Sequence, residues 1–168
     1  MITKIYKILT YILLLPAALL CITVFFSLLM AFANPGALLI TFVMACVVIY
    51  TVVSFNFLQK VIIQQKTVPN KLKDWLKVNA YVTTFFVFMM VTNIINIFMK
   101  PNLMNDLINQ MIEQQKNNPN MLVNQAVFYK FVMATFVLFF IYSLLLLIHI
   151  LCSFKLLKQY NNNFKDDI

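Results

Sequence analysis

The chain has 168 residues, of which 62% are hydrophobic and 11% charged, and its formal net charge is +8. Soluble domains have about 25% charged residues, so this composition excludes a water-soluble core. The lysines flank apolar runs instead of forming a basic patch with interleaved aromatic residues, which favours membrane orientation over nucleic-acid binding.

The first apolar run extends from Ile8 to Gln59 without a charged residue. As a single helix it would be about 78 Å long, whereas the hydrocarbon core of a bilayer is about 30 Å thick. The break falls at Asn34-Pro35-Gly36, which contains the only glycine of the chain. We therefore predict membrane-spanning helices over residues 8–33 and 37–59, joined as a tight hairpin. Pro16 lies inside the first span and predicts a kink there.

The beginning of the chain allows an alternative interpretation. Lys4 and Lys7 precede the apolar run, and Ala31-Phe32-Ala33 has the pattern of a signal-peptide cleavage site. The apolar segment of a signal peptide is about 7 to 15 residues long, and this run is longer. We therefore expect residues 1–33 to be retained, with cleavage as the alternative.

A basic segment, residues 60–77, follows the first hairpin and is predicted to be a loop at the membrane interface. Residues 78–99 and 131–154 then form two further uncharged runs, which we predict to be the third and fourth spans. Asn70 is a plausible cap for an interfacial first turn of the third helix, in which Leu72, Trp75 and Leu76 would face the lipid boundary. The predicted interface anchors are Lys60, Lys66, Lys71, Lys73, Trp75 and Lys77.

The lysines are unequally divided between the two sides of this four-span arrangement. One side carries Lys100, Lys116 and Lys130, and the other carries Lys4, Lys7, the five lysines of the basic segment, Lys155, Lys158 and Lys165. The positive-inside rule places the lysine-rich side, both termini and the tail 155–168 in the cytoplasm. Lysine without arginine, together with abundant asparagine, suggests AT-rich codons, so we expect the inner membrane of a bacterium.

The segment between the last two spans, residues 100–130, contains an amphipathic pattern of about 15 residues. Pro101 is typical of a helix start, and Asn117-Asn118-Pro119-Asn120 is typical of its end. This outer helix either rests on the bilayer and caps the bundle, or docks a partner. The stripe that would face a partner is Leu103, Leu107, Ile108 and Met111.

Polar residues inside the spans are the best candidates for packing or function, because hydrocarbon does not satisfy their hydrogen bonds. The third span carries Asn79, Thr83, Asn93 and Asn96 on one broad face, and the fourth carries Thr135, Tyr142, His149 and Ser153 along a line. Counting from the span ends matches Asn79 with Ser153, Thr83 with His149, and Asn96 with Thr135. We therefore predict that the two spans pack along these faces.

No motif in the sequence specifies a reaction. His149 could act as a proton relay instead of a packing residue, but the spans contain no Asp or Glu that could exchange protons with it. One histidine with isolated cysteines does not form a set of metal ligands. We expect no catalytic site, cofactor, metal, nucleic acid or small-molecule ligand. The sequence predicts one all-α membrane domain over residues 1–168. We expect it to act through helix packing as an accessory, scaffold or oligomer-forming subunit. The expected partners are the lipid bilayer and either another copy of the chain or another membrane protein. The alternatives are a small transporter or channel and, less favoured, a membrane enzyme.

Overall fold

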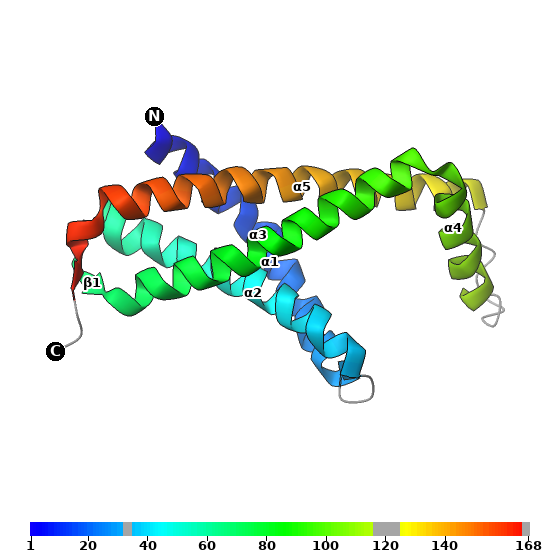
Figure 1. The fold of residues 1–168 in the computed structure, drawn as a ribbon, viewed down its shortest axis with the longest axis horizontal. Helices are drawn as coiled ribbons and strands as arrows, with labels where there is room; N and C mark the ends of the chain where they lie inside the picture. The colour runs from blue at the N-terminus through cyan, green and yellow to red at the C-terminus, as the bar shows by residue number, and fades with distance from the viewer. Residues whose placement is uncertain (32–34, 116–124, 166–168) are drawn as a thin grey trace. The chain divides into compact units, whose positions relative to one another are not determined.

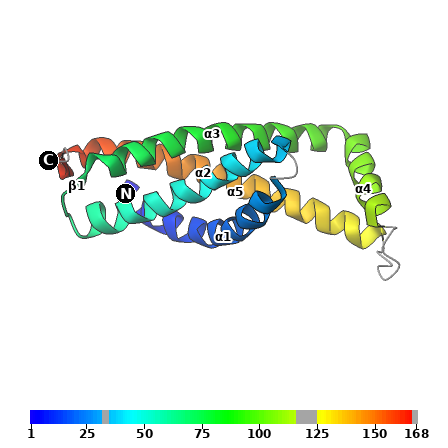
Figure 2. The same ribbon diagram turned by 90° about the horizontal axis from the view of Figure 1, so that it is seen from below.

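The computed structural model describes residues 1–31, 35–115 and 125–165 and confirms the all-α class. Four helices are long and apolar enough to cross a membrane: α1 (Ile2–Ala31), α2 (Pro35–Phe57), α3 (Asn70–Met99) and α5 (Gln125–Gln159). α1 and α2 run side by side in both ribbon views (Figures 1 and 2), as the predicted first hairpin requires. α1 continues through Pro16 without an interruption of its helical assignment.

The predicted loop over residues 60–77 is mostly helical in the structure. α2 continues into a π-helical segment, η1 (Leu58–Ile63), and α3 begins at Asn70. The reason is burial, because Val61 and Ile62 lie inside the protein while the flexible side chain of Lys60 reaches the surface. Leu76 was predicted to face lipid and is instead fully buried, whereas Trp75 on the same turn is exposed.

The chain end folds back onto the connection between η1 and α3. The 3-10 turn η2 (Asn161–Asn163) leads into β2 (Phe164–Lys165), which pairs in parallel with β1 (Val68–Pro69). The side-chain amide of Asn163 donates to the carbonyl of Gln65 at 3.4 Å, and Lys73 Nζ donates to Asn161 Oδ1 at 2.7 Å. We call this set of contacts the C-terminal clasp. It was not anticipated by the prediction of a simple tail.

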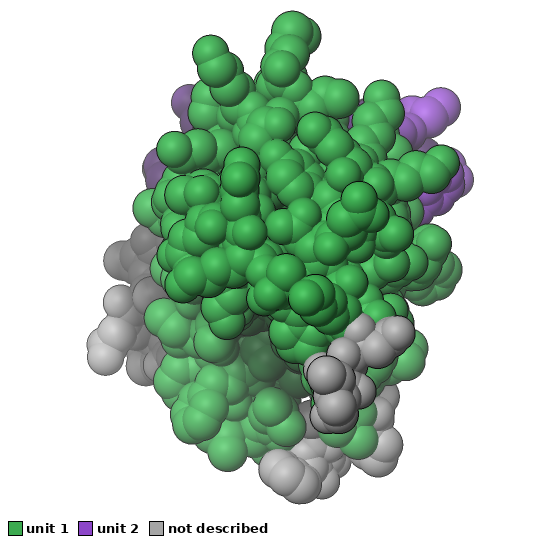
Figure 3. All heavy atoms as spheres, turned by 90° about the vertical axis from the view of Figure 1, so that its left-hand side faces the viewer, with its two compact units in different colours: residues 1–87, 145–168 green, residues 88–144 purple. Residues whose placement is uncertain are grey.

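The contacts divide the chain into two compact units, coloured separately in Figure 3. Unit 1 is residues 1–87 and 145–168, and unit 2 is residues 88–144. α3 and α5 each contribute one part to unit 1 and the other part to unit 2. The single membrane domain over residues 1–168 stays a prediction.

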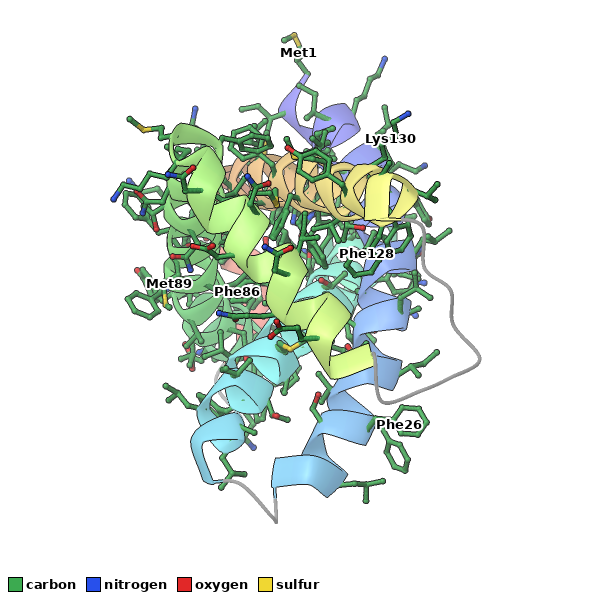
Figure 4. The ribbon with its side chains drawn as sticks, turned by 90° about the vertical axis from the view of Figure 1, so that its right-hand side faces the viewer. Met1, Phe26, Phe86, Met89, Phe128 and Lys130 are labelled. Carbon is green, nitrogen blue, oxygen red and sulfur yellow. The ribbon has the colours of Figure 1, made fainter. Side chains whose placement is uncertain are left out.

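Unit 1 buries polar side chains among apolar ones, and its helices have many exposed apolar side chains. The buried face of α1 combines Tyr6 and Thr10 with apolar side chains at helical spacing, and the exposed residues include Leu15, Phe25 and Phe26. Phe26 projects outward from the α1 ribbon in Figure 4. Such an exterior matches the composition of lipid and opposes exposure to water. The chain is thus a multi-pass membrane protein in its architecture.

Unit 2 contains the short helix α4 (Pro101–Gln115), which begins at the predicted proline. Met104 and Ile108 are each 2% exposed and form a small core with Val132, against which Phe128 and Phe136 pack. Ile108 therefore does not face a partner, because its own unit buries it. The side chains of Leu103, Leu107 and Met111 lie outside the described part of the structure, and the placement of α4 on the outer side of a membrane stays a prediction.

Candidate functional site

The main concentration of buried polar side chains in unit 1 lies between α1, α2 and α5. Six residues form this polar cluster, and each is at most 1% exposed: Tyr6, Thr10, Tyr50, Ser54, His149 and Ser153. Each helix contributes two of them at a spacing of four residues, so both side chains project from the same helical face. The local sequence therefore builds the cluster from three pairs, one on each helix.

His149 is the centre of the cluster. Its Nδ1 lies 2.8 Å from the hydroxyl of Tyr50, and its Nε2 lies 2.9 Å from Thr10 Oγ1 and 3.4 Å from Ser54 Oγ. The ring stacks on Tyr6 with a centroid separation of 4.5 Å and an interplanar angle of 8°. Tyr50 meets the same ring edge to face at 5.7 Å. Both nitrogens and one face of the imidazole are thus occupied by groups from other helices.

The hydrogen bonds assign the proton on the imidazole. The Thr10 hydroxyl has one proton and lies 2.7 Å from the carbonyl of Tyr6, which can only accept. With that proton committed, Thr10 Oγ1 accepts from Nε2–H of His149. Nδ1 is then the acceptor and takes the proton of the Tyr50 hydroxyl. A neutral imidazole with one donor and one acceptor satisfies this arrangement, and the six cluster residues include no carboxylate.

The remaining hydroxyls complete the cluster. The Tyr6 hydroxyl lies 2.6 Å from Ser54 Oγ, which joins α1 to α2. The Tyr50 hydroxyl also lies 2.9 Å from Ser153 Oγ, which joins α2 to α5 a second time. Because the Tyr50 proton goes to Nδ1, the Ser153 hydroxyl donates its proton to the Tyr50 oxygen, and the carbonyl of His149 at 3.0 Å is the alternative acceptor for that proton. Every side chain of the cluster therefore has a partner inside the cluster, and the hydrogen bonds connect all three helices to one another.

Aromatic contacts extend from the polar cluster to the C-terminal clasp. Tyr6 meets Phe57 edge to face at 6.1 Å, and Phe57 stacks on Phe164 at 6.1 Å with an interplanar angle of 14°. Lys73 Nζ lies 5.6 Å from the centroid of the Phe164 ring, within the range of a cation–π contact. His149 is thus linked through a series of aromatic rings, Tyr6, Phe57 and Phe164, to Lys73.

The predicted pairing of the third and fourth spans is wrong at the two levels that fall in unit 1. His149 bonds to α1 and α2 instead of Thr83, and Ser153 bonds to Tyr50 instead of Asn79. The amide of Asn79 donates to the carbonyl of Trp75 in its own helix at 2.8 Å. Thr83 is fully buried, and its Oγ1 has no hydrogen-bond partner. α3 does contact α5 in this unit, but through the rings of Tyr81 and Phe154, whose centroids are 5.4 Å apart.

The predicted polar residues of unit 2 do not form a second cluster within the described contacts. Asn93 and Asn96 are exposed. The hydroxyl of Thr135 donates to the carbonyl of Phe131 in its own helix at 2.9 Å, and the hydroxyl of Tyr142 is buried without a partner. The matched pair of Asn96 and Thr135 is therefore not joined by a bond from the Thr135 hydroxyl, which is directed to its own backbone.

Four members of the polar cluster were missed in the sequence: Tyr6, Thr10, Tyr50 and Ser54. The first span was predicted to begin at residue 8, which placed Tyr6 outside the membrane. The structure starts α1 at Ile2 instead. The usable signal is the spacing of four between Tyr6 and Thr10 and between Tyr50 and Ser54, which matches the spacing between His149 and Ser153. The third span also has polar pairs at this spacing, Asn79 with Thr83 and Thr92 with Asn96, so the spacing alone does not identify the three helices.

The predicted interface anchors fall into two groups. Lys60, Lys66, Lys71 and Trp75 are exposed, and Lys73 and Lys77 are half-buried. Lys73 is held by Asn161 and by the ring of Phe164, so it has a structural role in the C-terminal clasp. The anchoring role itself stays a prediction for all six residues.

The described residues offer no set of groups typical of a metal centre. Among residues 1–31, 35–115 and 125–165, no three His, Cys, Asp or Glu side chains lie close enough together to hold a metal ion. Cys46 is buried, Cys152 is half-buried and Cys21 is exposed, and all three are free. Comparisons of the chain with protein-family models, curated proteins and solved structures find no match, so the cluster is interpreted from its own geometry.

Proposed function

We propose that this chain is a non-catalytic multi-pass membrane protein that acts through helix packing, as an accessory, scaffold or oligomer-forming subunit. The observation that supports this most is the closed polar cluster. Its hydroxyl groups and imidazole nitrogens bond to one another and none is directed to an open site. Groups that bind or convert a substrate need free donors or acceptors, whereas groups that fix helix positions do not.

The setting we propose is the inner membrane of a bacterium, with both termini in the cytoplasm. The lysine bias supports this orientation, because both the helix ends and the C-terminal clasp carry lysines on the same end of unit 1. The partners would be lipid and either a second copy of the chain or another membrane protein. Cysteine labelling from each side of sealed vesicles tests the orientation, with engineered cysteines replacing Lys66 and Asn105.

Native mass spectrometry of the full chain, purified in mild detergent from its own membranes, tests the packing role. We expect a fixed stoichiometry with a second protein or with further copies. Photo-crosslinking groups placed at exposed positions such as Phe26 on α1 and Phe85 on α3 would then locate the contact. A bare monomer in the spectrum, with no crosslinks in membranes at either position, would contradict the proposal.

A small transporter or channel is the second candidate, and one observation favours it. Among the described residues, Thr83 and Tyr142 have buried side-chain oxygens without a hydrogen-bond partner. Unpartnered polar groups in a membrane protein can line a path for water or ions. Ion and proton flux into liposomes containing the purified chain tests this role, with empty liposomes and a Thr83→Val variant as controls. Flux that Thr83→Val abolishes would favour transport over packing.

A further inference from the structure

One end of unit 1 carries a high density of positive charge. The start of α3, the segment η1, the end of α5 and β2 lie at this end, which is the left-hand side of Figure 1 and faces the viewer in Figure 3. The start of α1 reaches the end of α2 next to η1 through the contact of Tyr6 with Phe57. Asp74 is the only acidic residue among the described residues of unit 1. We call the basic residues of this end the lysine collar: Lys4, Lys7, Lys60, Lys66, Lys71, Lys73, Lys77, Lys155, Lys158 and Lys165.

The C-terminal clasp concentrates part of this collar. The strand register places Lys165 opposite Pro69, which lies between Lys66 and Lys73 in the sequence. Lys73 is half-buried, and the contacts that hold it are the neutral amide oxygen of Asn161 and the ring of Phe164. Neither of these two contacts carries a negative charge. The clasp therefore brings lysines from two distant segments to one end of unit 1, where their charges attract anions. Asp166 and Asp167, which follow Lys165, lie outside the described residues.

The position of the clasp along the helices identifies those anions. Trp75, which is 56% exposed, follows Lys73 by less than one turn, and exposed apolar residues begin at Val78 and continue with Tyr81 and Phe85. A tryptophan next to the start of an apolar surface is typical of the headgroup level of a bilayer. The anions available at that level are the phosphodiester groups of lipids.

We propose that the lysine collar binds the phosphodiester headgroups of anionic phospholipids, with Lys66, Lys73 and Lys165 at the centre of the site. The apolar surface that begins at Val78 would contact the acyl chains of the same lipid. The C-terminal clasp has the function of placing these three lysines. This inference does not depend on the proposed packing function, because it concerns lipid and not a protein partner.

The test is lipid retention by the full chain. The protein is reconstituted in nanodiscs with equal amounts of phosphatidylglycerol and phosphatidylcholine, released into mild detergent, and analysed by native mass spectrometry. We expect phosphatidylglycerol to be retained preferentially. A juxtamembrane lysine contributes a factor of about five to the attraction of anionic lipid, so a Lys66→Gln/Lys73→Gln/Lys165→Gln variant should bind phosphatidylglycerol about a hundred-fold more weakly by the same scale.

Two further variants make the result specific. Lys66→Gln/Lys165→Gln leaves the Lys73 contacts of the clasp in place and should still weaken binding about 25-fold on that scale. Lys100→Gln/Lys130→Gln removes lysines of unit 2 and should leave phosphatidylglycerol retention unchanged. Equal retention of the two lipids by the natural chain would overturn the proposal, and so would unchanged retention in the triple variant.

Free phosphate is the remaining competitor for the same chemistry. Inorganic phosphate and chloride are added to the lipid-loaded protein at matched ionic strength. Equal loss of phosphatidylglycerol in the two salts supports a lipid site, because screening of the lysine charges by salt then explains the loss without specific binding of phosphate. Stronger displacement by phosphate would identify a site for the free anion and overturn the lipid proposal.

Discussion

The bond between Tyr50 and His149 provides the sharpest test of the polar cluster. His149→Leu removes the two short hydrogen bonds to Thr10 and Tyr50, the weaker contact with Ser54 at 3.4 Å, and the stack on Tyr6. It leaves no buried group without a partner, because Thr10 keeps the carbonyl of Tyr6 and Tyr50 keeps Ser153. Tyr50→Phe is different, because it leaves Nδ1 of His149 buried without a donor.

These differences give an order of free-energy losses. Hydrogen bonds between membrane helices contribute about 0.6 kcal/mol each, and an aromatic stack about 1 kcal/mol. His149→Leu should therefore destabilise the fold by about 2 kcal/mol. Tyr50→Phe also loses two interhelical bonds and adds about 1 to 3 kcal/mol for the buried acceptor, so its loss is about 3 kcal/mol. The double variant loses three bonds and the stack but leaves no orphan, which again gives about 3 kcal/mol.

The double variant should thus be about 2 kcal/mol more stable than the sum of the single variants implies. The free energies are measured by reversible unfolding in mixed micelles of rising SDS content, followed by circular dichroism. Tyr81→Phe is the matched control, since it removes a phenol hydroxyl from an exposed tyrosine that lies outside the cluster. Additive losses within about 0.5 kcal/mol, the usual result for independent sites, would refute the hydrogen-bond assignment.

Three further outcomes follow from other contacts. Phe164→Ala removes the ring that lies between Phe57 and Lys73. Trypsin should therefore cleave the C-terminal tail faster in this variant than in a Phe26→Ala control. An unchanged cleavage rate would show that the ring does not hold the clasp. Ile108→Ala should cost about 2 to 4 kcal/mol of local stability and raise amide exchange in α4, whereas Asn105→Ala at an exposed position should not. Thr83→Val replaces a buried hydroxyl without a partner and should leave stability unchanged or raise it by about 1 kcal/mol, so a measured loss would indicate a missing partner.

The sequence predicts the four apolar helices well, because a long uncharged run in lipid has to satisfy its backbone within itself. The helix ends are less predictable. α1 starts at Ile2 and α5 continues to Gln159, past lysines that were taken as span boundaries. Lysine side chains reach the surface from within a helix, so a charged residue marks the limit of the hydrocarbon and not the limit of the helix.

The polar cluster shows a different limit. His149 and Ser153 were chosen as polar residues along one line of the fourth span, and both are buried in the structure. Counting from the span ends gives their depth, but depth alone does not tell which of several helices they meet. Thr83 was assigned to His149 at equal depth, yet Thr10 and Tyr50 occupy both ring nitrogens. The choice between partners depends on how the helices rotate about their axes, which the count does not include. The position of Phe164 had no sequence signal at all, because its partner Phe57 lies far away in the chain.

The cluster also explains how a chain with four long apolar helices can have a defined arrangement of helices within unit 1. Contacts between leucine and phenylalanine side chains are hardly better than contacts of the same side chains with lipid, so they do not select one helix face over another. The hydrogen bonds of His149, Tyr50 and Tyr6 are directional, and each is lost when a helix rotates. The polar pairs therefore select the faces that meet inside unit 1, and the exterior is left apolar. Under the proposed packing function, variants in the cluster and variants on the exterior should therefore act differently. Variants in the cluster should weaken assembly with partners only as far as they unfold the chain. Variants of exterior residues should change assembly while the stability of the chain stays constant.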